Sequence, residues 1–237
     1  MDELSRRVDF LHSVPFLVSI EEPDLTWLAS FARSCRLGRN DFTYHAGEPA
    51  NALYIIQEGR LKVSKGSSAG REVAVGVMGP CDFVGCCAML DGVRMPCTAC
   101  AVEPVRLLVL PRERLTEVLS QHPAAALQLT QEFVRRLRGA HSHIKSLALD
   151  PVERRVIAVL VELGERFSTP KDGESRIPLP ITRQQIAELS GASGDTVCRV
   201  ISKLRRNHML RTDRRNIILT RSAHLARLAA EDDPVSP

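Results

Sequence analysis

A heptad repeat follows Pro123 and limits the possible folds of this chain more than any other pattern in it. One seam of side chains returns at alternating steps of three and four residues, at Leu127, Thr130, Val134, Leu137, His141, Ile144 and Ala148. Such a seam predicts a long helix over residues 123–149 that packs against a partner helix, most simply its copy in a second subunit. We therefore predict a homodimer whose interface contains the first six of these residues.

The same helix carries a second apolar flank, formed by Leu129, Phe133, Ala140 and Leu147. The alternative to dimerisation is that the heptad seam packs only on the preceding part of the chain. A helix with two apolar flanks can serve both that domain and a dimer partner.

The sequence before the helix is typical of a small antiparallel β domain. Runs suited to short strands occur at residues 53–56, 60–63, 71–75 and 105–110, and turns that contain Gly or Pro separate them. Many short strands divided by such turns predict an antiparallel barrel or sandwich.

A new domain is expected just after the long helix. Asp150 is a good N-cap and Pro151 suits the first position of a helix. We therefore predict an α+β chain with a β-roll sensor domain over 1–122, a dimerisation helix and hinge over 123–149, and a second domain over 150–237.

Two short helices are expected in the second domain. Thr182 and Gln185 form a capping-box pattern, and Ser193 is a suitable N-cap for the next helix. The inward side of that helix repeats at helical spacing through Val197, Val200, Ile201 and Leu204. Two short helices joined by a Gly-containing turn predict a helix-turn-helix.

The charge of this region favours a polyanionic partner. Between Ile181 and Arg221 there are nine basic and three acidic residues. The DNA-contacting candidates are Thr182, Arg183, Ser193, Asp195, Thr196, Arg199, Lys203, Arg205 and Arg206. Arg199 can pair with guanine, Asp195 can accept from a cytosine amine or orient Arg199, and the later basic residues can hold phosphates. The segment from Arg211 to Leu219 predicts a basic two-stranded wing.

The order of barrel, long helix, hinge, helix-turn-helix and wing resembles the CRP/FNR family of bacterial transcription regulators over essentially the whole chain. AGEPANALYIIQEG, from Ala46, resembles the barrel turn of that family, and ITRQQIA, from Ile181, and SGDTVCR, from Ser193, resemble its recognition signature. The resemblance implies a homodimer that binds a twofold-symmetric DNA site and contacts RNA polymerase. It assigns base reading to Asp195 and Arg199, whereas Gly194 and Cys198 depart from the family pattern and put the detailed sequence preference in doubt.

The effector region departs further from the family. In the cyclic-nucleotide-binding members that the chain resembles, the phosphate cassette reads Gly-Glu-x-x-Leu and is followed by an Arg-Ser pair. The glutamate accepts from a ribose hydroxyl, and the arginine binds the cyclic phosphate. Here Cys86 stands at the glutamate position, Met95 and Pro96 stand at the Arg-Ser position, and Arg94 lies one residue away. We therefore expect a regulator that cyclic AMP does not control, with a cyclic-nucleotide-responsive regulator as the alternative. The effector-pocket candidates are Gly85, Cys86, Cys87, Arg94, Cys97 and Thr98.

The chain has seven cysteines and no secretory signal, which predicts a cytoplasmic protein with reduced thiols. Cys86, Cys87, Cys97 and Cys100 are candidate ligands for an iron-sulfur cluster or zinc. The alternative is that they only pack, since strand alternation would send Cys97 and Cys100 to opposite faces. Haem bound through His12, His45, His141 or a pocket cysteine is a further alternative. The N-terminal cysteine group of the oxygen-sensing branch is absent, because residues 1–34 contain no cysteine.

Cys198 is a redox candidate of a different kind. It lies beside Arg199 and close to other basic side chains in the expected DNA-facing helix. Oxidation there would add negative charge or bulk next to DNA phosphates. The simpler interpretation is a small residue where Gly or Ser also fits.

Other classes of function fit the sequence less well. A cupin-type metal enzyme needs several histidines in the barrel, and His45 stands there alone, so we expect no enzyme. A nucleotide-binding regulatory module that does not act on DNA is disfavoured by the basic helix-turn-helix. No apolar run approaches the roughly 18 residues of a membrane span.

Overall fold

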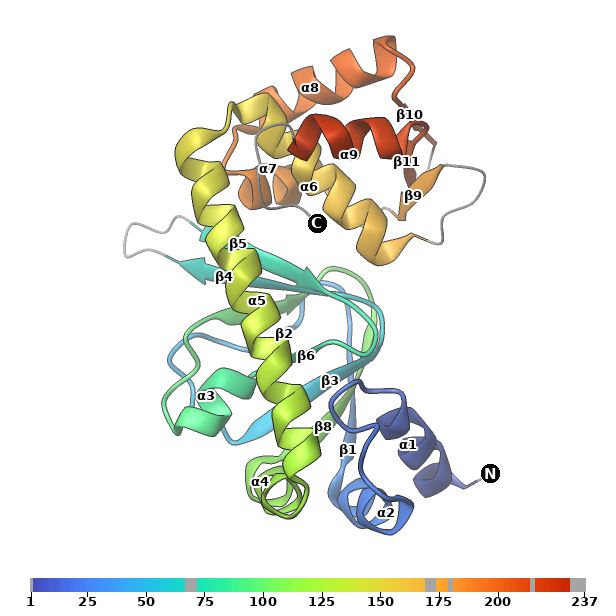
Figure 1. Cartoon of the computed structure of the whole chain (residues 1–237), viewed down its shortest axis with the longest axis vertical. Coiled ribbons are helices and arrows are strands. Elements are labelled where there is room, and N and C mark those ends of the chain that lie inside the picture. The colour runs from blue at the N-terminus through green and yellow to red at the C-terminus, as the bar shows by residue number, and fades with distance from the viewer. Residues whose placement is uncertain (1, 67–71, 169–173, 179–180, 214–215, 231–237) are drawn as a thin grey trace. The chain divides into compact units, whose positions relative to one another are not determined.

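The structure is a computed structural model that describes residues 2–66, 72–168, 174–178, 181–213 and 216–230. Arg71, at the start of one expected strand, and the wing residues Arg214 and Arg215 lie outside these ranges. The chain forms two compact units, Met1–Ala140 and His141–Pro237 (Figure 1). The predicted boundaries, which set residues 123–149 apart from both domains, remain a prediction.

The first unit is an antiparallel β-roll with short helices around it (Figure 1). One sheet has the order β1 (Arg33–Leu37), β8 (Val105–Pro111), β3 (Ala52–Glu58) and β6 (Phe83–Val84). The other has the order β2 (Phe42–Tyr44), β7 (Thr98–Ala101), β4 (Leu61–Gly66) and β5 (Glu72–Met78). The helices of this unit before the long helix are α1 (Glu3–His12), α2 (Glu22–Phe31), α3 (Cys86–Asp91) and α4 (Arg112–Gln121).

The expected turn residues close this roll. Gly59, between β3 and β4, has φ +79°, and a Cβ there would lie 2.3 Å from the carbonyl oxygen of Pro104. Only glycine fits such a turn without moving the backbone. The alternating burial of the strands then directs Leu53, Ile55 and Leu107 into one continuous core.

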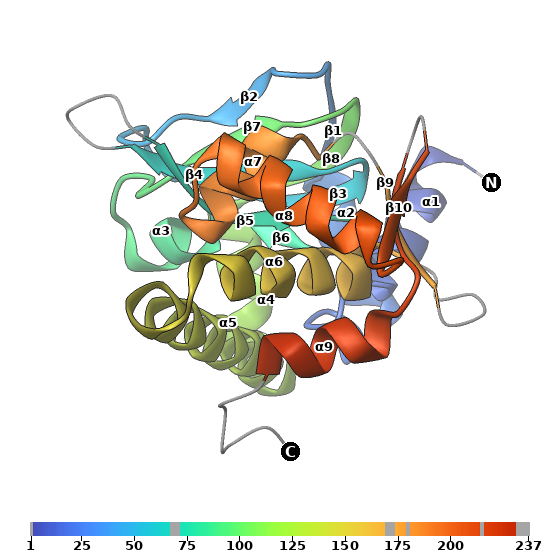
Figure 2. The same ribbon diagram turned by 90° about the horizontal axis from the view of Figure 1, so that it is seen from above.

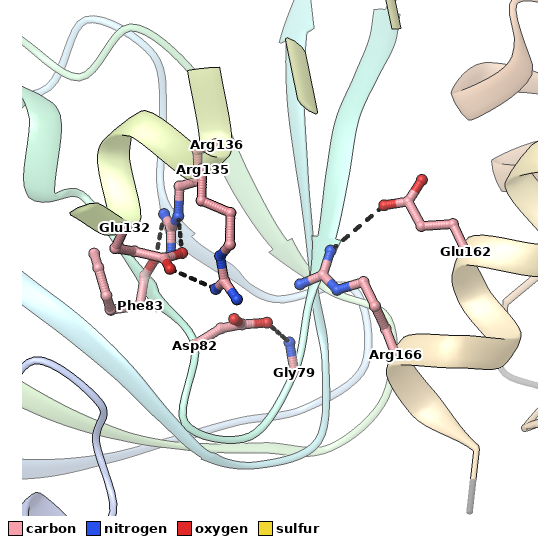
Figure 3. Close-up of polar contacts among 8 residues, drawn as sticks. All are labelled: Gly79, Asp82, Phe83, Glu132, Arg135, Arg136, Glu162 and Arg166. Atoms are coloured by element: carbon pink, nitrogen blue, oxygen red, sulfur yellow. Dashed lines mark hydrogen bonds and ion pairs between the residues drawn. The ribbon is translucent and has the colours of Figure 1, made fainter. Parts of the chain in front are cut away.

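The long helix α5 (Pro123–Leu149) has the predicted length and runs through the boundary between the units. Its first half is fastened to the β-roll. Leu129 is buried in the core and Phe133 packs against it. Arg136 donates from Nη1 to the carbonyl oxygen of Phe83 at 3.1 Å and pairs through Nε with Glu132 at 2.8 Å (Figure 3).

The second unit is a winged helix-turn-helix. Its elements are α6 (Val152–Phe167), β9 (Ser175–Pro178), α7 (Arg183–Ser190), α8 (Gly194–Arg206), β10 (Leu210–Thr212), β11 (Asn216–Leu219) and α9 (Ser222–Ala230). The three strands pair antiparallel in the order β10, β11, β9, and the C-terminal end of α8 leads directly into β10 (Figure 2). The α+β prediction of a β-roll, a long helix and a winged helix-turn-helix is confirmed.

One local prediction is wrong. Asp150 is not the N-cap of α6, because Pro151 has extended backbone (ψ 144°) and takes that position. The carboxylate of Asp150 instead pairs with Arg154 at 3.5 Å.

Candidate nucleic-acid interface

The first helix of the motif, α7, starts at the predicted capping box. The main-chain N–H of Gln185 donates to Thr182 Oγ1 at 3.2 Å, and the main-chain N–H of Thr182 donates to the side-chain Oε1 of Gln185 at 2.8 Å. These two bonds satisfy amides that a helix N-terminus leaves without a partner. The helix ends at Gly191, whose φ of +59° is the left-handed conformation of a C-cap.

The second helix, α8, starts two residues later. Ser193 accepts from the Thr196 amide at 3.2 Å, as predicted for its N-cap. The inward side of α8 is buried through Val197, Val200, Ile201 and Leu204, which confirms the predicted spacing. Since that side packs on its own unit, the opposite side of α8 is the one that can meet a partner.

The outer side of α8 presents charge. The side chains of Asp195, Arg199, Lys203, Arg205 and Arg206 are exposed, together with Ser202. Arg199 donates from Nη2 to Thr196 Oγ1 at 3.1 Å, and that hydroxyl lies 2.9 Å from Ser193 Oγ. The N-cap of the helix therefore also orients Arg199, which is one of the two roles that the sequence analysis offered for Asp195.

Three basic side chains of this unit, including two of the predicted DNA contacts, have partners within the protein. Lys203 pairs with Glu153 of α6 at 2.6 Å. Arg183, at the start of α7, donates from Nη1 to the half-buried thiol of Cys198 at 3.8 Å. In the wing, Arg211 pairs with Glu174 at 2.8 Å. Glutamates of the same unit therefore orient Lys203 and Arg211, and the Cys198 thiol accepts from Arg183.

Arg155 of α6 supports the helix-turn-helix from within the unit, and the sequence analysis missed it. Its guanidinium donates to the main-chain carbonyls of Ser190 and Gly191, at the end of α7, at 2.9 and 3.1 Å. Since a carbonyl is present at every position, no pattern of side chains signals these contacts.

The effector-pocket candidates surround a filled interior. Cys86 and Met95, at the positions of the nucleotide-binding acid and arginine, are each 2% exposed and belong to the core of the β-roll. A Cβ on Gly85, the N-cap of α3 at φ +86°, would lie 3.2 Å from Met95 Cε.

The polar candidates in this region bind the main chain. Arg94 is exposed and donates from Nη1 to the carbonyl oxygen of Gly47 at 2.8 Å. Thr98 accepts from the Ala46 amide at 3.0 Å. Neither group is directed into the core of the roll.

The four candidate metal-ligating cysteines are not brought together. The residues that the structure describes contain no group of three or more His, Cys, Asp or Glu side chains able to hold a metal ion. Cys86 points into the core, whereas Cys100 lies on the face of β7 opposite the buried Ala99 and Ala101. All seven cysteines are free thiols.

Cys87 differs from its neighbours in its acidity. The hydrogen bond from Cys86 and the charge of Arg136 lower the pKa of the Cys87 thiol to about 6, against the effect of burial. The hydrogen bond to Cys87, with burial, raises the pKa of Cys86, and burial raises the pKa values of Cys97 and Cys100. Cys87 lines an open hollow of about 480 Å³ with Leu90, Asp91 and Phe133.

No described helix is both long enough and apolar enough to cross a membrane.

Two family models match the chain and together cover more than half of it. The model of the cyclic nucleotide-binding domain matches residues 35–122, and that of the Crp-like helix-turn-helix domain matches residues 154–228.

Similar proteins agree with these matches. The chain is 28% identical over 229 residues to the CRP-like cAMP-activated global transcriptional regulator of Mycobacterium tuberculosis, covering 97% of this chain and 100% of that protein. It is 26% identical over 217 residues to the transcriptional activator protein anr of Pseudomonas aeruginosa, covering 91% and 88%. The solved structure of FixK2 from Bradyrhizobium japonicum has the same fold, with a TM-score of 0.74 at 24% identity over 83% of this chain and 96% of that one.

Proposed function

The chain belongs to the CRP/FNR family of transcription regulators, and on that basis we propose that it is a homodimer that binds a twofold-symmetric DNA site in the cytoplasm and contacts RNA polymerase there. The observation that carries the proposal is the outer side of α8. A capped helix with exposed Asp195 and Arg199 near its start and Arg205 and Arg206 at its end suits a major groove flanked by phosphates. The relatives from Mycobacterium tuberculosis and Pseudomonas aeruginosa named above are transcription regulators, and we assign no catalytic step to this chain.

The heptad seam of α5 supports the homodimer. Its apolar members Leu127, Val134, Leu137 and Ile144 are 43 to 62% exposed in the single chain. Fully burying such a side chain contributes about 1.5–3 kcal/mol. A second copy of α5 covers the seam by heptad packing, and a dimer would then present two α8 helices to two half-sites.

The filled interior supports independence from cyclic AMP. Met95 and Cys86 are buried in the core, so a nucleotide at their positions would have to displace well-packed side chains and would gain neither a guanidinium nor a carboxylate from them. Titration calorimetry with cyclic AMP should show no binding heat and no change in affinity for DNA. Saturable binding with tighter DNA association would instead establish the cyclic-nucleotide-responsive alternative.

A redox response through Cys198 is the second part of the proposal. A hydroperoxide would transfer its terminal oxygen to the Cys198 sulfur to give sulfenic acid, while the O–O bond breaks and water or an alcohol leaves. Further oxidation would add a fixed negative charge next to Arg183, which contacts the thiol. This chemistry needs no metal ion.

The test of the redox proposal compares peroxide treatment of the wild type and of Cys198→Ser. We expect peroxide to weaken DNA binding of the wild type only. Equal loss of binding in the Ser variant would move the response to another thiol.

The test of the homodimer and its DNA site starts from a DNA sequence selected from random duplexes. Sedimentation should give two chains per duplex, and the selected sequence should be an inverted repeat. Leu137→Glu should yield a monomer with greatly reduced affinity, whereas the matched control Val18→Glu, at another exposed apolar residue, should stay dimeric. Selection of no symmetric sequence, or a dimeric Leu137→Glu protein, would refute the proposed assembly.

A further inference from the structure

One arginine joins the end of the long helix to the turn of the DNA-binding motif. Arg155 donates from Nε to the carbonyl oxygen of Ser190 at 2.9 Å and from Nη2 to that of Gly191 at 3.1 Å. Its Nη1 donates to the carbonyl oxygens of Leu147 at 3.3 Å and Asp150 at 3.4 Å. A single planar group therefore contacts two chain segments about forty residues apart in the sequence.

The four acceptors lie where helices end. Ser190 and Gly191 close α7, and Leu147 and Asp150 lie in the last turn of α5 and just beyond it. The final carbonyls of a helix have no partner within the helix and carry the negative end of its dipole. A cation that donates to two such ends at once stabilises both and holds them together.

Side-chain packing reinforces the same junction. A Cβ on Gly191 would lie 2.8 Å from Leu147 Cδ2, so the α5 side chain already rests on the turn. Gly191 also has φ +59°, and Ser193, the N-cap of α8, follows it by two residues. The N-cap of α8 therefore lies two residues after the glycine that contacts the end of α5.

We propose that Arg155 is a positioning residue that fixes the recognition helix α8 relative to the last turn of α5, and so sets the distance between the two half-sites that a dimer reads. The inference rests on the proposed function, because it needs two copies of α8 on one DNA. Arg155 itself contacts no base. Its effect is on the spacing of the DNA site and not on its sequence.

Lysine cannot replace this arginine. Four acceptors in two directions require the planar fork of the guanidinium, whereas an ammonium group is a single point. Arg155→Lys keeps the charge and removes the bridge, so it separates geometry from electrostatics. Leu147→Ala loosens the same junction by removing the packing on Gly191 and leaves every carbonyl in place.

The experiment measures affinity for the selected inverted repeat and for versions with one base pair added or removed at its centre. A single half-site duplex is measured in parallel. The wild type should lose about tenfold or more in affinity on either change of spacing. Arg155→Lys should lose less than about threefold while its half-site affinity stays within about twofold of the wild type. Leu147→Ala should lie between the two, and Arg227→Ala, an exposed arginine of α9, should match the wild type.

The outcomes separate this inference from the proposed function. If the wild type depends on spacing and Arg155→Lys, folded by circular dichroism, depends on it equally, the positioning role is wrong and the proposed function stands. If Arg155→Lys does not fold, an unchanged spacing dependence of Leu147→Ala would refute the role in the same way. If the wild type binds no inverted repeat, both are wrong.

Discussion

The interior of the β-roll and the outer side of α8 place their candidate contact residues in opposite environments, one buried and one exposed. In the roll, the positions that nucleotide-binding relatives give to ligand contacts hold Cys86 and Met95, both buried in the core. In α8, the chemistry-bearing side chains Asp195 and Arg199 are exposed, while the apolar residues between them hold the helix to its unit. In the first region these positions belong to the packed core, and in the second the packing residues and the candidate DNA contacts lie on separate faces of one helix. Substitutions should therefore damage stability in the first region and binding in the second.

The largest expected effect is on stability in the roll. Met95→Ala should lower the free energy of unfolding by about 2–5 kcal/mol, because it opens a cavity in a packed core. Urea denaturation followed through Trp27 measures this unit. The neighbouring and half-exposed Val93→Ala should change it by less than about 0.5 kcal/mol. A small effect of Met95→Ala, or ligand binding gained with it, would mean that the interior is a site after all.

The next effect is on binding in α8. Arg199→Ala should leave the unfolding curve unchanged and weaken binding to the selected DNA by about 5- to 150-fold, the value of about 1–3 kcal/mol for a bidentate base contact. Competition with unrelated DNA should show that discrimination is lost. Arg227→Ala is the matched control. Equal weakening on every DNA sequence would assign Arg199 to phosphate contact instead.

A smaller effect tests whether stability and binding are separable inside the motif. Thr182→Ala removes one half of the capping box and should cost about 0.5–2 kcal/mol of local stability. Hydrogen exchange of the α7 amides should then be faster by about 2- to 30-fold. Thr182→Ser, which keeps the hydroxyl, should restore most of the protection. Protection that stays unchanged in the Ala variant would show that α7 is held by its packing alone.

The smallest effect concerns the one acidic thiol of the roll and leaves fold and DNA binding unchanged. The pKa of Cys87 is about 6, so its thiolate forms as pH rises through that value. Alkylation of Cys87 by iodoacetamide should accelerate between about pH 5 and pH 7 and then level off, whereas Cys97 and Cys100, with raised pKa values, should react only in more alkaline solution. Peptide mass spectrometry measures each rate. Cys86→Ala should move the Cys87 profile to higher pH, and an unchanged profile would contradict the assigned cause.

The sequence predicts best what short spacing determines. The Thr182–Gln185 box, the Ser193 cap and the inward face of α8 depend on neighbours within one or two helical turns, and all three are confirmed. The β-roll class followed from turns such as that at Gly59. What the spacing of the cysteines could not give was direction, since the core takes Cys86 while Cys100 faces away from it.

Competition between partners explains both the wrong N-cap at Asp150 and the observed partner of Arg199. Aspartate is a favoured N-cap residue, yet the Asp150 carboxylate forms an ion pair with Arg154 one turn later. Asp195 is a reasonable partner for Arg199, yet the Thr196 hydroxyl, held by the Ser193 cap, binds that guanidinium. Which of two adequate partners wins depends on rotamers that a linear pattern does not encode.

The Arg155 junction has a consequence for how such a protein can change over generations. Its four acceptors are main-chain carbonyls, and these persist whatever side chains stand at Ser190, Leu147 and Asp150. The Arg155 contacts therefore place few demands on the side chains around them, apart from the glycine at 191 and the Leu147 side chain that packs on it. Substitutions on the outer side of α8 can therefore change which DNA sequence the helix binds while the Arg155 contacts keep the helix in place.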